Sequence, residues 1–167
     1  GDSGTSSRMF ATLLSWMNDR TSSAFLVCTS NNHTVLPPEL IRRGRLDEAF
    51  WIDVPDEQER REIFQVIFQE IRKDLSLFDL DRLVKLTKDF TGAELRHVVK
   101  ASLFEAFASK KELDQVVLVR TISFFKPYAS THAQELSELR AKAVHKLTPV
   151  NQTESPDYIE KSIRALG

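Results

Sequence analysis

The stretch Leu36-Pro37-Pro38-Glu39-Leu40-Ile41-Arg42-Arg43-Gly44-Arg45-Leu46-Asp47 carries the strongest signal in this 167-residue chain. Proline fixes its own backbone angle and glycine permits a tight turn, so the sequence predicts a constrained loop. Arg42 and Arg45 lie within it, three residues apart. Because the planar guanidinium group matches the geometry of a phosphate, we interpret the stretch as a turn that presents arginines to phosphate.

An apolar run lies just upstream, Ala24-Phe25-Leu26-Val27-Cys28, and it ends in the polar residues Thr29-Ser30-Asn31-Asn32. Such a run is typical of a strand that is covered on both faces in a parallel sheet. A strand that stops at short polar residues before an arginine turn is half of a nucleotide site. The other half is missing, because no G-x-x-x-x-G-K-S/T phosphate cradle occurs in the sequence.

Composition narrows the class of protein. Hydrophobic residues make up 41% and charged residues 28%, as in ordinary globular proteins. A net charge of -1 disfavours general binding to nucleic acid or to a membrane surface. Cys28 is the single cysteine and the histidines lack metal-ligand spacing, so neither a disulfide nor a metal site is expected. The chain starts at Gly1 without a methionine, and we expect it to be the C-terminal part of a longer product.

The pattern divides the chain at Pro55 and again near residue 125. Residues 1–54 combine a loop at 1–7, a helix from Arg8, the strand at 24–28 and a second strand at 50–54. Residues 55–125 are expected to be purely helical. Residues 126–167 are expected to form a helical extension over 131–147 and a loose tail, with a short amphipathic turn at 158–163.

Start signals place the helices after Pro55. Asp56 with Glu59, and Thr91 with Glu94, have the spacing of capping boxes, while Asp79 is an expected N-cap. A further helix is expected from about Asp114 to Ser123. The apolar stripes of these helices predict a core made of Ile63, Phe64, Val66, Ile67, Ile71, Leu95, Val98, Val99, Leu103, Ala106, Phe107, Val116, Val117, Val119 and Ile122.

These motifs resemble the second half of an AAA+ ATPase module. The resemblance rests on the Gly-Asp-Ser-Gly-Thr start, a tryptophan-containing helix, the Leu-Pro-Pro-Glu-Leu turn at 36–40 and Thr-Gly-Ala-Glu-Leu at 91–95. Within the superfamily the chain most resembles the uncharacterised AAA proteins of cyanobacteria and plastid genomes. The implied fold is α/β followed by all-α: the last strands of a P-loop NTPase parallel sheet, then a small helical lid domain.

The resemblance also implies roles for single residues. Asn31 occupies the sensor-1 position, which orients the water that attacks the γ-phosphate, with Asn32 as the alternative if the loop shifts by one. Arg42 and Arg45 occupy the arginine-finger positions, which reach the ATP site of a neighbouring subunit. Arg43 stands where the family commonly has proline, which leaves open which arginine contacts phosphate.

Three positions in the lid are implied to bind nucleotide. Ile63 falls where the first lid helix touches adenine, and Gly92 and Ala93 match the sensor-2 turn. Ala93 replaces the arginine of many AAA+ clades, so no sensor-2 arginine is expected. The residues themselves leave other readings open: Ile63 as core, Asn31 as a turn former, and Glu94 as a cap rather than a ligand contact. Asp53 imitates a Walker-B carboxylate, but its place after the arginine turn favours a turn former at a strand end.

The resemblance implies an ATP hydrolase that works at the subunit interfaces of a hexameric ring and remodels an unknown protein partner. ATP and Mg²⁺ would be held mainly by the missing N-terminal part, so the isolated chain is expected to be inactive. A cyanobacterial cytoplasm or plastid stroma is the expected location, with no membrane and no nucleic-acid partner. A non-hydrolysing AAA-like scaffold is the main alternative, and a clamp-loader-like subunit is disfavoured by Ala93 and the near-neutral charge.

Overall fold

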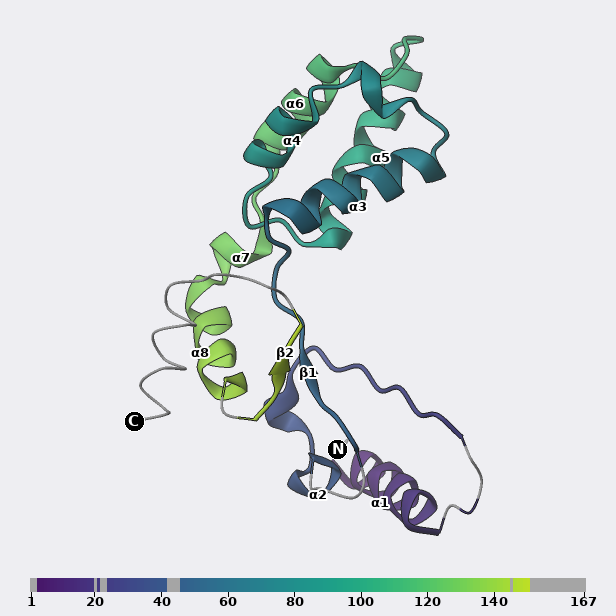
Figure 1. Cartoon of the computed structure of the whole chain (residues 1–167), viewed down its shortest axis with the longest axis vertical. Coiled ribbons are helices and arrows are strands. Elements are labelled where there is room, and N and C mark those ends of the chain that lie inside the picture. Colours follow the sequence, from purple (N-terminus) through teal and green to yellow (C-terminus); the bar gives the residue numbers. More distant parts are fainter. Residues whose placement is uncertain (1–2, 20, 22–23, 42–45, 145, 151–167) are drawn as a thin grey trace.

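The computed structural model describes the chain except residues 1–2, 20, 22–23, 42–45, 145 and 151–167 (Figure 1). A helical bundle lies at one end and a looser lobe at the other, joined by a narrow connection. The elements are α1 (Ser3–Asp19), η1 (His33–Val35), α2 (Pro38–Ile41), β1 (Phe50–Trp51), α3 (Glu57–Glu70), η2 (Leu75–Leu77), α4 (Leu80–Leu86), α5 (Gly92–Ala108), α6 (Gln115–Phe124), α7 (Tyr128–Thr131), α8 (Ala133–Ala143) and β2 (Thr148–Pro149).

The bundle consists of α3, α4, α5 and α6, and it holds nearly all of the described apolar core. The T-shaped rings of Phe68 and Phe78, with centroids 4.8 Å apart, close one part of it. A strand-containing segment followed by packed helices confirms the predicted α/β-then-helical fold class. The side chains buried at its centre are Phe64, Ile67, Phe68, Leu83, Val84, Phe90, Leu95, Val98, Val99, Ala106, Leu113, Leu118 and Ile122.

Three predicted core positions are wrong. Val66, Phe107 and Val116 are exposed, and Phe107 is 83% exposed. At about 100° per residue, Val66 and Val116 point well away from the buried positions of their helices, so apolar character alone did not mark the buried face. Leu118 on α6 is fully buried instead of its neighbours. Hydrophobic periodicity thus located the helices better than it located the exact core face.

The predicted helix starts are confirmed by their hydrogen bonds. The Asp56 carboxylate accepts from the Glu59 amide at 2.8 Å, and the Glu59 carboxylate accepts from the Asp56 amide at 2.8 Å. Asp79 caps α4 by accepting from the Arg82 amide at 2.9 Å. Asp114 caps α6 in the same way. Because each cap satisfies amides that the helix leaves unpaired, these local signals fix where the bundle helices begin.

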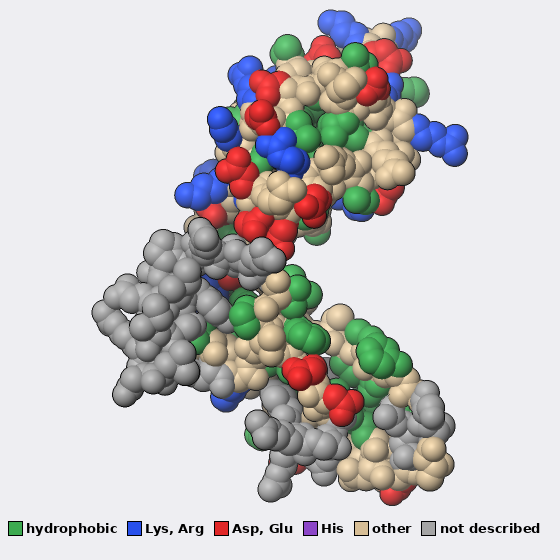
Figure 2. Space-filling model, in the orientation of Figure 1, with side chains coloured by type: hydrophobic (Ala, Val, Ile, Leu, Met, Phe, Trp, Pro, Cys, Tyr) green, Lys and Arg blue, Asp and Glu red, His purple; other side chains and the backbone are tan. Residues whose placement is uncertain are grey.

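The first 54 residues differ from the prediction. Residues 24–28 form no strand; they run without a ladder, and Phe25 and Val27 are 94% and 71% exposed. A buried parallel strand needs neighbours on its edges and cover on its faces, and the described residues supply neither here. Helix α1 begins at Ser3, within the segment expected to be a loop. Figure 2 shows hydrophobic side chains at the surface of this lobe, whereas charged and polar side chains cover much of the bundle.

The second predicted strand exists but is short. β1 covers Phe50–Trp51 rather than 50–54, and it pairs in parallel with β2, placing Phe50 opposite Thr148 and Trp51 opposite Pro149. The expected helix at 131–147 is divided into α7 and α8 around His132. The amphipathic turn expected at 158–163 lies outside the described residues. No helix in the described part of the chain is long and apolar enough to cross a membrane.

A buried arginine that the sequence did not reveal holds the start of the bundle. Arg60 is only 6% exposed. Its Nη1 donates to the Pro55 carbonyl at 2.8 Å, and its Nη2 donates to the Val84 carbonyl at 3.3 Å. Burial lowers the pKa of Arg60, and the carboxylates of Glu57, Asp89 and Asp56 oppose that shift. One guanidinium therefore ties the connection before α3 to the C-terminal turn of α4.

We expect Arg60→Met to lower the free energy of unfolding by about 1.5–3 kcal/mol, because the buried carbonyl of Val84 and the partly buried carbonyl of Pro55 lose hydrogen bonds from a charged donor. Urea denaturation followed by circular dichroism measures the change. Arg61→Met is the matched control, since Arg61 pairs at the surface with Asp81 and its loss should cost at most about 1 kcal/mol. Equal losses in the two variants would contradict the anchoring role of Arg60.

Candidate functional site

The structure brings together two of the three predicted nucleotide-binding residues of the lid. Ile63 lies on α3, and Gly92 is the first residue of α5. A Cβ placed on Gly92 would meet Ile63 Cδ1 at 3.6 Å, which is ordinary van der Waals contact. An alanine would therefore fit against Ile63, so packing inside the bundle does not itself require glycine here. Ala93 follows at the surface and is exposed.

Glu94 is committed to holding this turn together. Its Oε2 accepts from the Thr91 amide at 2.7 Å and from Thr91 Oγ1 at 2.9 Å. Its Oε1 accepts from the Tyr128 amide at 2.7 Å. The Thr91 hydroxyl in turn accepts from the Glu94 amide. Since both carboxylate oxygens are used, Glu94 is a structural cap, as its spacing from Thr91 predicted.

The side chains of Asn31 and Asn32 differ clearly in their contacts. The Asn32 side chain caps η1 by accepting from the Thr34 amide at 2.9 Å and from Thr34 Oγ1 at 2.7 Å. Asn31 lies in a bend and is exposed, and no side chain in the described part of the chain forms a hydrogen bond with it. The capping role that an asparagine can play here therefore belongs to Asn32. Asn31 is left accessible at the end of the 24–30 segment.

The arginine turn is described only at its edges. Arg42 and Arg45 lie outside the described residues, together with Arg43 and Gly44. Just before them, α2 begins at Pro38, and the Leu40 amide donates to the Pro37 carbonyl at 2.9 Å. Leu40 is buried. The Pro-Pro start therefore leads into an anchored turn of helix immediately before Arg42.

Asp53 has a partner that sequence reasoning missed. Its Oδ1 accepts from the Val54 amide at 2.7 Å, which agrees with the predicted turn former. Arg140 on α8 binds the same carboxylate with two bonds, Nε to Oδ2 at 2.6 Å and Nη2 to Oδ1 at 2.7 Å. This hydrogen-bonded pairing raises the pKa of Arg140. No local signal could have identified the pair, because 87 residues separate its members.

His33, the first residue of η1, packs against Trp51 of β1. Its ring contacts that of Trp51 edge-on, with centroids 5.9 Å apart. Both ring nitrogens are buried without a hydrogen-bond partner in the described structure. Burial lowers the pKa of His33, and the positive charges of Lys146 and Lys142 lower it further. Burial and the neighbouring lysines therefore favour the neutral form of the imidazole.

The His33 environment predicts an acid-sensitive lobe. The pKa of His33 is lowered from 6.5, so below pH 6.5 the unfolded chain binds more protons than the folded chain. The contribution of His33 to the free energy of unfolding is therefore present above pH 6.5. It is lost as the pH falls from 6.5 toward the lower pKa of the folded state. We expect urea unfolding, followed by tryptophan fluorescence between about pH 7.5 and pH 5.5, to show this loss. His33→Phe should reduce it; an unchanged pH dependence in that variant would contradict the assignment.

The chain matches one protein family and several individual proteins. Residues 1–54 match the family described as "ATPase family associated with various cellular activities (AAA)". The chain is 38% identical to the "Uncharacterized AAA domain-containing protein ycf46" of Trieres chinensis over 86% of its own length and 29% of that protein. The same-named protein of Guillardia theta is 37% identical over 83% of this chain and 28% of its own length.

More distant similarity extends to a proteasome component. The "26S proteasome regulatory subunit S10B homolog B" of Arabidopsis thaliana is 34% identical over 59% of this chain and 24% of that protein. In each of these matches the chain spans less than a third of the relative's length.

Proposed function

The chain belongs to the AAA family of ATPases, and from that premise we propose that it supplies the sensor, arginine-finger and lid parts of an ATP-hydrolysing module. The observation that carries this proposal is the meeting of Ile63 with Gly92 at the start of α5, beside the exposed Ala93. The apolar side chain of Ile63 offers a surface to a base. The backbone at Gly92, which has no Cβ, can be approached by a polar group.

The local chemistry at this helix start suits a nucleotide. The first amides of an α-helix have no intrahelical acceptor and carry partial positive charge. In α5 the cap uses the amides of Thr91 and Glu94, which leaves those of Gly92 and Ala93 outside the capping box. Ile63 would contact the adenine, and the backbone at Gly92 would approach the nucleotide. No described cluster of histidine, cysteine or carboxylate side chains could hold a metal ion. In the proposed module, Mg²⁺ and most phosphate contacts would come from parts of the AAA module that this chain does not include.

Asn31, Arg42 and Arg45 complete the proposed division of roles. The accessible amide of Asn31 would orient the attacking water in the chain's own site. Arg42 and Arg45, after the anchored α2 turn, would reach the site of a neighbouring copy, where a guanidinium stabilises the charge that develops in phosphoryl transfer. The finger role requires a neighbouring copy, so the proposal includes a homo-oligomer, most simply a ring. Action on a protein partner is a further part of the proposal. The ycf46 relatives support a plastid or cyanobacterial setting.

The arginine-finger assignment is tested in the full-length parent with Arg45→Ala. We expect the ATP hydrolysis rate to fall by about 10³- to 10⁵-fold with nucleotide affinity nearly unchanged, because a finger acts on the transition state of the adjacent site. Steady-state phosphate release and titration with a fluorescent ATP analogue measure the two quantities. Arg61→Ala, which removes a surface ion pair on the bundle, is the control. Normal turnover in the Arg45→Ala protein would refute the assignment.

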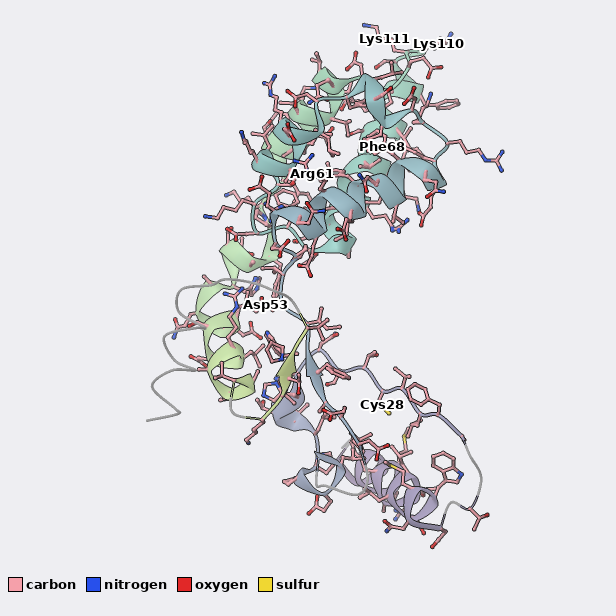
Figure 3. All side chains as sticks on the ribbon, viewed as in Figure 1. Cys28, Asp53, Arg61, Phe68, Lys110 and Lys111 are labelled. Carbon is pink, nitrogen blue, oxygen red and sulfur yellow. The ribbon has the colours of Figure 1, made fainter. Side chains whose placement is uncertain are left out.

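The lid assignment is tested with Gly92→Ala. Because a Cβ fits beside Ile63, the free energy of unfolding should stay within about 1 kcal/mol of the wild-type value. Nucleotide affinity of the parent should nevertheless fall, since the methyl group blocks approach to the backbone. Lys111→Ala, at the far end of the bundle, should change neither quantity (Figure 3). Unchanged nucleotide affinity with Gly92→Ala would exclude close approach at this turn.

A further inference from the structure

The described residues of 126–144 and 146–150 leave the end of α6 and return to the opposite lobe (Figure 1). They comprise α7, α8 and β2, and we call them the strap. The N-terminal lobe, defined as described residues 3–53, is thus connected to the bundle twice. The chain enters the bundle after Asp53 and leaves it again at residues 125–127.

The strap is fixed to the bundle at its beginning. The Tyr128 amide donates to Glu94 Oε1 at 2.7 Å, which joins α7 to the capped start of α5. The ring of Phe125, just before the strap, lies 5.4 Å from that of Phe90 in the bundle core. Tyr128 and His132 stack with ring centroids 4.1 Å apart, which stiffens the short helix between them. The strap therefore leaves the bundle from a held position rather than as a free tail.

The strap is fixed to the N-terminal lobe at its other end by backbone pairing. The Thr148 amide donates to the Ala49 carbonyl at 2.9 Å, and the Val150 amide donates to the Trp51 carbonyl at 3.0 Å. These bonds add β2 to one edge of β1 in parallel. Two residues per strand make a weak sheet by themselves, so this contact needs support from side chains.

Asp53 and Arg140 provide that support at the junction. The carboxylate is 11% exposed, and Arg140 holds both of its oxygens in a two-bond geometry. Paired charges with two parallel bonds are among the strongest and most directional hydrogen-bonded contacts in proteins. Figure 3 places Asp53 at the narrow junction between the bundle and the other lobe. Pro55, two residues later, is itself held by Arg60 of α3.

We propose that the strap sets the angle between the bundle and the N-terminal lobe, and that the Asp53–Arg140 pair is its latch. A single connection at Val54 and Pro55 would allow the bundle to rotate about those backbone bonds. A second connection, attached to α5 at one end and to β1 at the other, removes that freedom. Opening the latch leaves the short β1–β2 pairing and the packing of α8 against η1 as the described contacts that hold the strap to the N-terminal lobe. This inference does not depend on ATP hydrolysis.

The test measures the angle through a distance in the full 167-residue chain. Spin labels are placed on Glu48→Cys, just before β1, and on Lys110→Cys, at the far tip of the bundle, in a Cys28→Ser background (Figure 3). Pulsed electron spin resonance then gives the distribution of distances between them. We expect one narrow distribution with the intact latch, and a broadened and shifted one with Arg140→Gln.

Two further variants make the result decisive. Asp53→Asn keeps the size of the side chain and weakens the pair, so it should broaden the distribution less than Arg140→Gln, and it serves if that variant fails to fold by circular dichroism. Arg96→Gln removes the ion pair with Glu70 at the surface of the bundle, between α5 and α3, and should leave the distribution unchanged. An unchanged distribution in folded latch variants, or equal broadening with Arg96→Gln, would overturn the proposal.

Discussion

The closed apolar core of the bundle is the constraint on which the rest of the structure depends. It contains nearly every fully buried side chain in the described part of the chain, including Phe64, Leu95 and Leu118. Capping residues at each helix start align the four helices around this core, and Arg60 ties the incoming chain to it. The described residues of the N-terminal lobe form no comparable core. The position of this lobe therefore depends on its two connections to the bundle, through Pro55 and through the strap.

The candidate site follows from the same arrangement. The cap formed by Thr91 and Glu94 fixes the first turn of α5, and the packing of α3 against α5 brings Ile63 to Gly92. The carboxylate of Glu94 also receives the Tyr128 amide, so the turn proposed to approach nucleotide and the start of the strap share one side chain. A displacement of this turn would therefore also move the start of the strap, because the Tyr128 amide is bonded to Glu94.

Sequence reasoning succeeded where the determining interactions are local. Capping spacings located the bundle helices, and the AAA resemblance agrees with the matched family and relatives. It failed where distant or missing partners decide the outcome. Residues 24–28 have the composition of a buried strand, but no described neighbour completes a sheet around them. The pairing of Asp53 with Arg140 joins positions that no short pattern connects, and Val116 shows that an apolar stripe can be wider than the buried face.

The parallel pairing of β1 with β2 also bears on the order of folding. The bundle helices contact one another across short loops, whereas Phe50 meets Thr148 only after all of the intervening chain has been made and packed. Closing a long loop costs more entropy than closing a short one, and contacts between distant residues form late. The bundle should therefore assemble first and act as a template, so that its completed surface brings the two ends of that loop within reach of each other.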